Sequence, residues 1–248
     1  MKAVLAELRY FKESISIISE LVSEVKFKAT TQGLELVAMD PANVSMVIFK
    51  LLSSCFTQYQ VQETEELAIN LNNLKQILRR ASGDDLLSLE TTEDNKLKII
   101  LKGATTRSFS IPLLELEEKE QKVPELQFPI AIETDSELLS ESVEDVSVVA
   151  ESVTLLGEKG QLSVKAEGDL SKAFIEVKPD DRTSIKTASS DKFKAKYSLE
   201  YLKKMIQGGK LADRVSLHFN SAYPLQLEYK VVDRLVLSFI LAPRVDND

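Results

Sequence analysis

The 248-residue sequence is poor in the residues from which enzymes usually build reactive centres. It contains no tryptophan, and its single histidine and single cysteine are His218 and Cys55. One cysteine cannot form an internal disulfide, which favours a reducing compartment and a role for Cys55 as a small buried side chain. The same counts argue against a zinc site or a Ser–His–Asp triad. Because His218 stands between Leu217 and Phe219, we expect its ring to face solvent.

Long apolar runs and glycine-rich loops are also missing. Although 44% of the residues are apolar, no segment approaches the roughly 18 uninterrupted apolar residues of a membrane span. Charges from Glu7 onward interrupt the stretch in which a secretory signal needs its apolar segment, so we expect no such signal. The eight glycines are scattered and form no phosphate-cradling loop, and we expect no cofactor. Asp84–Asp85 and Asp180–Asp181 could hold a hard cation, but we interpret both pairs as turns and expect no metal.

An excess of positive charge is absent too. The 31 basic and 39 acidic residues give a net charge of −8, whereas ordinary duplex binding depends on a basic footprint. This balance does not exclude a protein that collects its basic residues on one face.

The most informative feature is an internal repeat with a constant offset of 128 positions. Leu199, Leu202 and Ile206 fall on Leu71, Leu74 and Leu78 when 128 is subtracted, and the same offset holds with no insertion across about a hundred residues. The repeat predicts two duplicated domains of ordinary size, residues 1–116 and 128–248. Between them, residues 117–127 form a charged connector that Pro124 interrupts.

Each half has the same predicted order of elements, with a helix followed by several antiparallel strands occurring twice. Helices that carry one apolar stripe, beside half-apolar strands, indicate an α+β arrangement with two helices packed on antiparallel sheets in each domain. The expected helices are 11–23, 71–81, 136–150 and 199–206; the expected strands of the first half are 2–9, 25–30, 34–39, 44–52, 86–90, 97–102 and 107–114.

Basic residues recur on these helices. Lys75 and Arg79 share one flank of the second helix, and Lys203 is the 128-partner of Lys75 on the same flank of the fourth. Repetition at one register favours a shared surface over solvated helix faces. The third helix differs, because it contains no Lys or Arg and carries Glu137, Glu141, Glu144 and Asp145.

Several motifs together resemble the archaeal and eukaryotic sliding clamp, the proliferating cell nuclear antigen family, from end to end. They are LVAMDP at 36–41 followed by VSMV at 44–47, helix 71–81 followed by GDDL at 83–86, EGD at 167–169, PLQLEYK at 224–230 and LAPRV at 241–245. The resemblance implies a DNA-clamp fold whose subunits form a ring of three around duplex DNA. It implies a non-enzymatic processivity factor for replication and DNA repair, inside the cell in the archaeal cytoplasm and nucleoid or in a nucleus.

The resemblance also implies three sets of site residues. The DNA-facing set is Lys12, Lys75, Arg79, Arg80, Lys203, Lys204 and Lys210. Short peptides of DNA polymerase, clamp loader, flap endonuclease and DNA ligase would bind Met39, Val44, Val123, Pro124, Tyr201, Pro224, Ile240, Ala242 and Pro243. Subunits, identical or related, would pair through the edge strands 107–114 and 173–178, with Phe109, Ile111, Leu113, Phe174, Ile175 and Val177.

Two alternatives remain open at this point. The acidic third helix favours a specialised subunit that works only in a heteromeric ring of related chains, for repair or damage signalling. A hydrolase or transferase that uses paired acids would need a cleft with perturbed carboxylates, and the sequence offers no such constellation.

Overall fold

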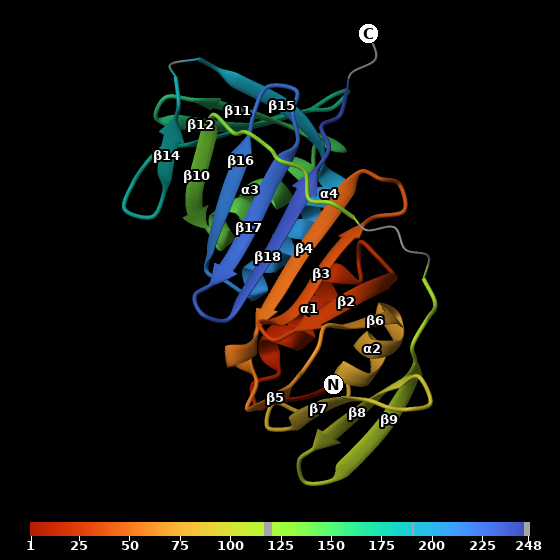
Figure 1. The fold of residues 1–248 in the computed structure, drawn as a ribbon. Helices are drawn as coiled ribbons and strands as arrows, with labels where there is room; N and C mark the ends of the chain where they lie inside the picture. Colours follow the sequence, from red (N-terminus) through yellow and green to blue (C-terminus); the bar gives the residue numbers. More distant parts are fainter. Residues whose placement is uncertain (117–120, 190, 246–248) are drawn as a thin grey trace. The chain divides into compact units, whose positions relative to one another are not determined.

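The computed structural model describes residues 1–116, 121–189 and 191–245, so residues 117–120 of the expected connector lie outside the described part. The chain divides into two compact units. The first contains Met1–Pro41, Val47–Val123 and Val231–Leu237; the second contains Ala42–Met46, Pro124–Lys230 and Ser238–Asp248. Each unit is an α+β structure with antiparallel sheets (Figure 1).

The first unit has two sheets with strand orders β5-β1-β7-β8-β9 and β4-β3-β2-β6. Its elements are β1 (Lys2–Leu5), α1 (Arg9–Ile18), β2 (Glu24–Thr30), β3 (Gly33–Met39), β4 (Ser45–Leu52), η1 (Ser53–Cys55), β5 (Gln58–Gln60), β6 (Glu65–Asn70), α2 (Leu71–Leu78), β7 (Leu86–Thr91), β8 (Lys96–Lys102) and β9 (Thr106–Pro112).

The second unit repeats this plan with strand orders β14-β10-β16-β17-β18 and β13-β12-β11-β15. Its elements are β10 (Ile130–Asp135), α3 (Ser136–Ser147), β11 (Ser152–Glu158), β12 (Gln161–Glu167), β13 (Lys172–Val177), β14 (Ser184–Thr187), β15 (Phe193–Ser198), α4 (Leu199–Met205), η2 (Ile206–Lys210), β16 (Arg214–Phe219), β17 (Leu225–Val231) and β18 (Leu235–Leu241). Three strands are divided by the unit bounds: Val231 of β17 and Leu235–Leu237 of β18 are counted with the first unit, and Ser45 and Met46 of β4 with the second.

The two units have the same topology, strand for strand and α-helix for α-helix. Adding 128 to the bounds of β2, β3 and β6 gives the bounds of β11, β12 and β15. The strand orders also correspond, since β5-β1-β7-β8-β9 matches β14-β10-β16-β17-β18 under the same offset. The repeat read from apolar positions is therefore a repeat of structure.

The α-helices each carry one apolar stripe, and α2 also begins at a capping residue. Asn70 caps α2, because its side chain accepts hydrogen bonds from the backbone of Asn72 at 3.0 Å and of Asn73 at 3.3 Å. The predicted strand 2–9 was wrong at its end: β1 stops at Leu5, and Arg9 begins α1. The predicted helix 11–23 was too long, because α1 ends at Ile18.

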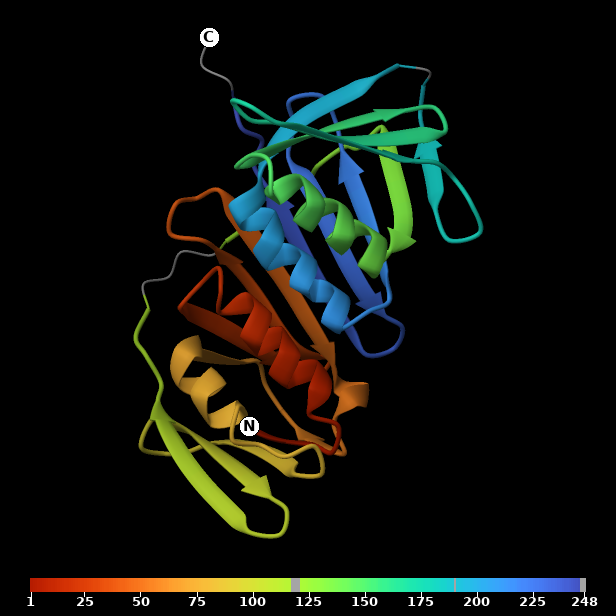
Figure 2. The ribbon, with the colours of Figure 1, turned by 180° about the vertical axis from the view of Figure 1, so that it is seen from behind.

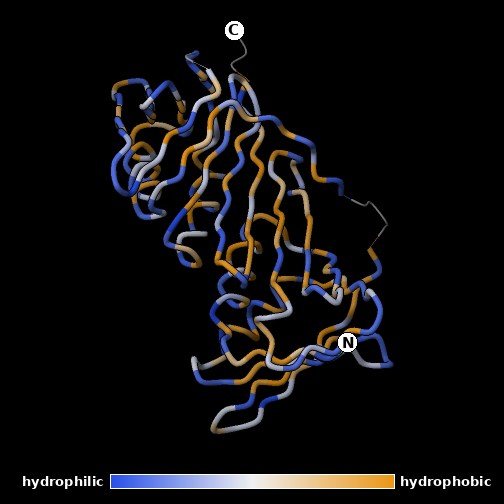
Figure 3. Tube along the Cα trace, turned by 60° about the vertical axis from the view of Figure 1, so that its left-hand side comes forward, coloured by the Kyte–Doolittle hydropathy of each residue, from blue (hydrophilic) through white to orange (hydrophobic). Residues whose placement is uncertain are grey.

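Within each unit the helices pack side by side on one face of the sheets. Figure 2 shows α1 beside α2, and α3 beside α4, with the strands behind them. Phe11, Ile15 and Ile18 fill the core under α1, and their 128-partners lie on α3. Apolar and polar residues alternate along the strands (Figure 3), so each sheet has a buried face and an outer face. This one-sided packing leaves a helix face exposed in each unit.

Candidate nucleic-acid and partner interfaces

The helix face of the first unit carries exposed arginines and two partly covered lysines. Arg79 and Arg80 follow the end of α2 and are exposed. The Lys12 ammonium on α1 donates to Ala81 O at 3.1 Å. Lys75 is more enclosed: its side chain is 11% exposed and its Nζ lies 2.5 Å from Glu20 Oε1. Most of the free positive charge of this face therefore comes from the arginines.

The helix face of the second unit is of mixed charge. Lys203 Nζ lies 3.2 Å from Glu144 Oε2 on α3, and Lys204 Nζ lies 3.2 Å from Glu200 Oε1. Lys210, at the end of η2, is exposed. The carboxylates of α3 thus neutralise part of the charge that α4 provides.

Lys75 and Lys203 occupy equivalent positions and reach the same turn of the neighbouring helix. Lys75 Nζ lies 3.4 Å from Ser16 O, and Glu144, which holds Lys203, is the 128-partner of Ser16. Both lysines therefore join the two helices of their unit. The repetition that suggested a shared surface also has this structural cause.

The sheets end in two long open edges. In the described residues, β9 bonds only to β8 and β13 only to β12. The edge strands β5 and β14 are short. The edge strands β6 and β15 are covered by neighbouring backbone, since Leu114 N donates to Ala68 O on β6 at 2.8 Å and Arg244 N donates to Lys196 O on β15 at 2.7 Å. Edge strands of soluble proteins are normally blunted or covered, whereas β9 and β13 are the long uncovered edges among the described strands.

The six predicted interface residues lie on or just beyond these edges, with their side chains on different faces. Ile111 is 6% exposed and Val177 7% exposed, whereas Phe174 is 57% exposed. Phe174 belongs to the outer face of its sheet, where Lys165 Nζ lies 5.0 Å from the ring centroid. Phe109, Leu113 and Ile175 are half-buried.

The surroundings of the two edges carry opposite charges. Arg107 on β9 donates to Arg80 O at 2.7 Å, which gathers Arg79, Arg80 and Arg107 at this end of the first unit. Beside β13, a groove of about 460 Å³ is lined by α3 and the strand, and it contains Glu141, Asp145 and Glu176 together with Lys178. Glu141 and Asp145 therefore lie on the side of α3 next to an open edge.

Most of the predicted client-peptide residues belong to the second unit, and Met39 and Val123 to the first. Ala242 N donates to Val44 O at 2.9 Å, which brings the start of β4 beside the end of β18. Pro224, Ala242 and Pro243 are half-buried, Pro124 is exposed and Ile240 is 8% exposed. Tyr201 lies on α4, and Lys204 Nζ sits 5.4 Å from its ring centroid. Met39 is half-buried and Val123 is 46% exposed.

The prediction that the His218 ring faces solvent holds only in part, because the residue lies on the polar side of β16 but is half-buried. Its ring lies 5.6 Å from the Phe128 ring, and Phe128 in turn contacts Tyr223 edge-on at 6.0 Å between centroids. Burial lowers the pKa of His218 from its ordinary value, against the opposing effect of Glu228 and Glu133. The signal in the sequence was Phe128, which begins the segment after the connector and folds over the strand.

The two acidic pairs of the sequence, Asp84–Asp85 and Asp180–Asp181, make other contacts in the structure. In the described part of the chain, no group of three or more His, Cys, Asp or Glu residues could hold a metal ion. Asp85 is ion-paired with Arg107, and Asp180 accepts from the backbone of Arg182 and Thr183, as expected for turns. Among the described residues, no helix is long and apolar enough to cross a membrane.

These observations define a duplicated α+β scaffold whose notable surfaces are cationic helix ends and two open edges. Residues 1–121 match the family model for the N-terminal domain of proliferating cell nuclear antigen, and residues 122–244 match the model for its C-terminal domain. The chain therefore belongs to the proliferating cell nuclear antigen family, and the predicted DNA-clamp fold is confirmed.

Individual relatives agree with the family assignment over nearly the whole chain. The chain is 35% identical over 237 residues to a DNA polymerase sliding clamp of Pyrococcus furiosus, covering 96% of this chain and 95% of that one. It is 34% identical over 249 residues to the clamp of Nanoarchaeum equitans, covering 99% and 100%. The crystal structure of proliferating cell nuclear antigen from Thermococcus kodakaraensis matches with a TM-score of 0.91 at 27% identity, covering 98% and 99%.

Proposed function

We propose that this chain is a subunit of a sliding clamp, a ring that encircles duplex DNA and tethers DNA polymerase and other replication and repair enzymes without catalysing a reaction itself. The duplication is the observation that supports this most strongly. Two units of one topology, each with its helices on one face of the sheets, are suited to repeat around a ring. The names and full-length coverage of the relatives support the same function.

The ring closes in this proposal by pairing β9 of one subunit with β13 of the next. A head-to-tail contact of this kind generates a closed ring when its rotation fits. The charges favour the pairing, since arginines surround β9 and carboxylates of α3 lie beside β13. Glu141 and Asp145 then meet a neighbouring subunit instead of phosphates, which accounts for acidic residues on a helix of a DNA-binding protein.

The duplex contacts the helix faces through dispersed cations. Arg79, Arg80 and Lys210 are exposed, Lys12 donates to a backbone carbonyl, and the charges of Lys203 and Lys204 are partly neutralised by glutamates. Lys75 contributes least, because Glu20 and Ser16 hold its ammonium. Weak contacts suit a ring that must slide, because a closed ring cannot dissociate sideways and does not need tight phosphate binding.

Client peptides bind an apolar surface at the ends of β4 and β18. Val44, Pro224, Ile240 and Ala242 supply its partly covered apolar side chains, and the connector residues Val123 and Pro124 are exposed for contact. Domains 1–116 and 128–248 and connector 117–127 are the organisation that we propose for the subunit.

Retention on circular DNA tests the clamp proposal. The chain, alone or with related subunits, is loaded by its ATP-driven loader onto a nicked circular duplex, and the complex is isolated by gel filtration. The proposal requires retention on the circle and release when one cut linearises the DNA. Equal retention on circular and linear duplex would show ordinary binding and contradict the clamp.

A subunit of a heteromeric ring is the second candidate, because α3 lacks basic residues altogether. Native mass spectrometry of the isolated chain separates the two versions. A stable assembly of three copies supports a homomeric ring. A monomer that associates only with related subunits supports the heteromeric ring and its specialised role.

A further inference from the structure

The outer face of the sheet β13-β12-β11-β15 holds a concentration of lysines that neither ring closure nor the helix faces use. Cross-strand register places Phe174, Lys165, Thr154 and Lys196 in one row across the four strands. The next row contains Lys194, opposite Leu156. In a chain with net charge −8, this is an unusual collection of positive charge.

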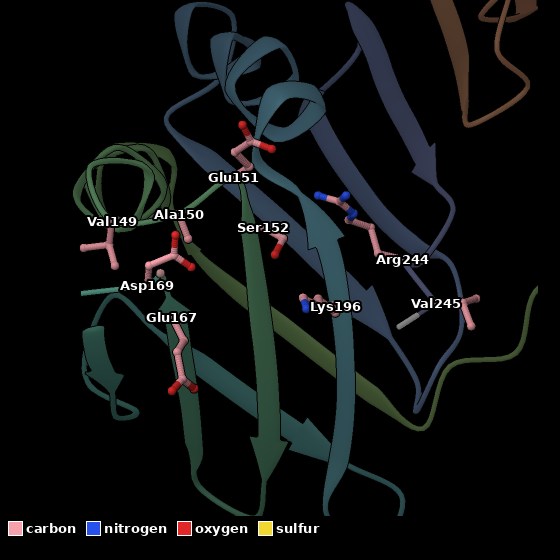
Figure 4. A pocket seen from close by; sticks show the side chains of 10 residues that line it. Val149, Ala150, Glu151, Ser152, Glu167, Asp169, Lys196, Arg244 and Val245 are labelled. Atoms are coloured by element: carbon pink, nitrogen blue, oxygen red, sulfur yellow. The ribbon is translucent and has the colours of Figure 1, made fainter. Parts of the chain in front are cut away.

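A groove of about 400 Å³ follows these rows. It is lined by Lys165, Lys172 and Lys194 together with Leu156 and Phe174. A second cleft of about 630 Å³ shares Glu167 with it and adds Lys196 and Arg244. Figure 4 shows Lys196 on its strand and Arg244 on the segment after β18, together with the acidic side chains of Glu151, Glu167 and Asp169 that line the same cleft.

Three carboxylates of this face are already ion-paired. The second cleft also contains Glu151 and Asp169, so the excess of positive charge lies in the first groove, where Glu167 faces Lys165, Lys172 and Lys194. Glu167 is ion-paired with Lys172, Glu176 with Lys178 at 2.8 Å, and Glu158 with Lys192 at 2.9 Å. The ion pair with Lys172 lowers the pKa of Glu167, so the pair stays charged near neutrality. In the described residues, by contrast, Lys165 and Lys194 have no carboxylate within ion-pair distance, and Lys165 rests over Phe174.

We propose that this outer groove is a docking site for an extended acidic peptide segment of a partner protein, with carboxylates on Lys165 and Lys194 and an apolar side chain against Leu156. Lys165 on β12 and Lys194 on β15 lie two strands apart, which is about 10 Å across the strands. An extended peptide crossing the strands covers that distance in about three residues. The recognised pattern therefore has two acidic residues about three positions apart with an apolar residue between them.

Nucleic acid fits this surface less well. A continuous phosphate backbone would pass the carboxylates of Glu158, Glu167 and Glu176, which are interleaved with the lysines. The exposed aromatic ring of Phe174 already carries the Lys165 ammonium, so it offers less of a platform for stacking bases. Isolated carboxylates on a peptide can meet single lysines and avoid the acidic positions.

Fluorescence anisotropy with a labelled short peptide, Gly-Ser-Glu-Leu-Ala-Glu-Ser-Gly, tests the proposal on the full chain. We expect the Kd to rise about tenfold for the double variant Lys165→Glu with Lys194→Glu, since two attractive contacts become repulsive. The matched control, Lys159→Glu with Lys186→Glu, changes two exposed lysines of the same unit by the same charge and should bind like the unaltered chain. Circular dichroism verifies that both variants are folded.

Three results would overturn the proposal. The first is an equal loss of affinity in both double variants, which would show attraction to net charge alone. The second is unchanged affinity when serine replaces the peptide leucine, which would show that the leucine makes no apolar contact with the groove. The third is tighter binding of a single-stranded oligothymidylate that competes with the peptide, which would assign the groove to nucleic acid. None of these outcomes depends on ring formation, so failure here leaves the clamp proposal intact.

Discussion

Replacing Arg107 with alanine should lower the free energy of unfolding of the first unit. It should also weaken assembly through the open edge strand β9. The guanidinium donates to Arg80 O at 2.7 Å and is ion-paired with Asp85, a residue only 4% exposed. Asp85 also accepts from Ser82 N at 2.7 Å. The variant Arg107→Ala would therefore leave a buried carboxylate with one remaining donor.

The expected cost follows from these contacts. A lost hydrogen bond to a carbonyl costs about 1 kcal/mol. Breaking a fully buried ion pair costs about 3–5 kcal/mol, and the 31% exposure of the Arg107 side chain reduces this to about 2 kcal/mol. We expect the free energy of unfolding of the first unit to fall by about 3 kcal/mol. Lys96→Ala is the control, because its ion pair with Asp94 is exposed to solvent and should contribute little to stability.

Hydrogen exchange measured by mass spectrometry across a urea series resolves this effect. Peptides that cover β7, β8 and β9 should exchange through global opening at lower urea in Arg107→Ala than in the unaltered chain. Native mass spectrometry of the same variant reports whether assembly also weakens. If Arg107→Ala and Lys96→Ala unfold at the same urea concentration, the buried pair does not stabilise the unit, and the reasoning is refuted.

Three further outcomes are expected in the second unit. Gly208→Ala should lower the free energy of unfolding in urea by about 2 kcal/mol, because a Cβ there would overlap the buried Tyr229 ring. The control Gly83→Ala places its Cβ in open space and should change stability little, so equal effects would contradict this packing. The pKa of His218 is lowered on folding, so the unfolded state binds the proton more readily and stability is lost as pH falls below the unfolded pKa of about 6.5. The stability advantage over His218→Gln should accordingly shrink between about pH 7 and pH 5 in urea titrations, and a constant difference would argue against it. Tyr201→Ala should weaken client-peptide binding measured by calorimetry while the chain stays folded, and an unchanged affinity would remove this residue from the site.

Much of the fold could be predicted from the sequence because the duplication is preserved in the apolar positions. The offset of 128 was visible in Leu71, Leu74 and Leu78 and their partners, and these side chains are buried in both units. Short polar strands escaped prediction. β5 is Gln-Tyr-Gln and β14 is Ser-Ile-Lys-Thr, and neither has an alternating apolar pattern long enough to recognise.

Side-chain environments were harder to predict because they depend on contacts between distant segments. Periodicity placed Lys75 on an exposed flank, yet its ammonium is covered by Ser16 on α1 and by Glu20 just after α1. The same limit applied to His218, which lies on the polar side of its strand as expected but is covered by Phe128. Helix ends were overestimated since Leu21 and Val22 are buried from a turn after α1.

The two uncovered strands, β9 and β13, also bear on how cells must produce this protein. Exposed backbone donors and acceptors along a strand invite aggregation with any other chain that offers the same. In the ring that we propose, each such strand pairs with a neighbouring subunit, so assembly would also protect the strands from aggregation. If the ring is built from different subunits, a surplus of this chain would be left with both strands unmatched, which favours synthesis in balanced amounts.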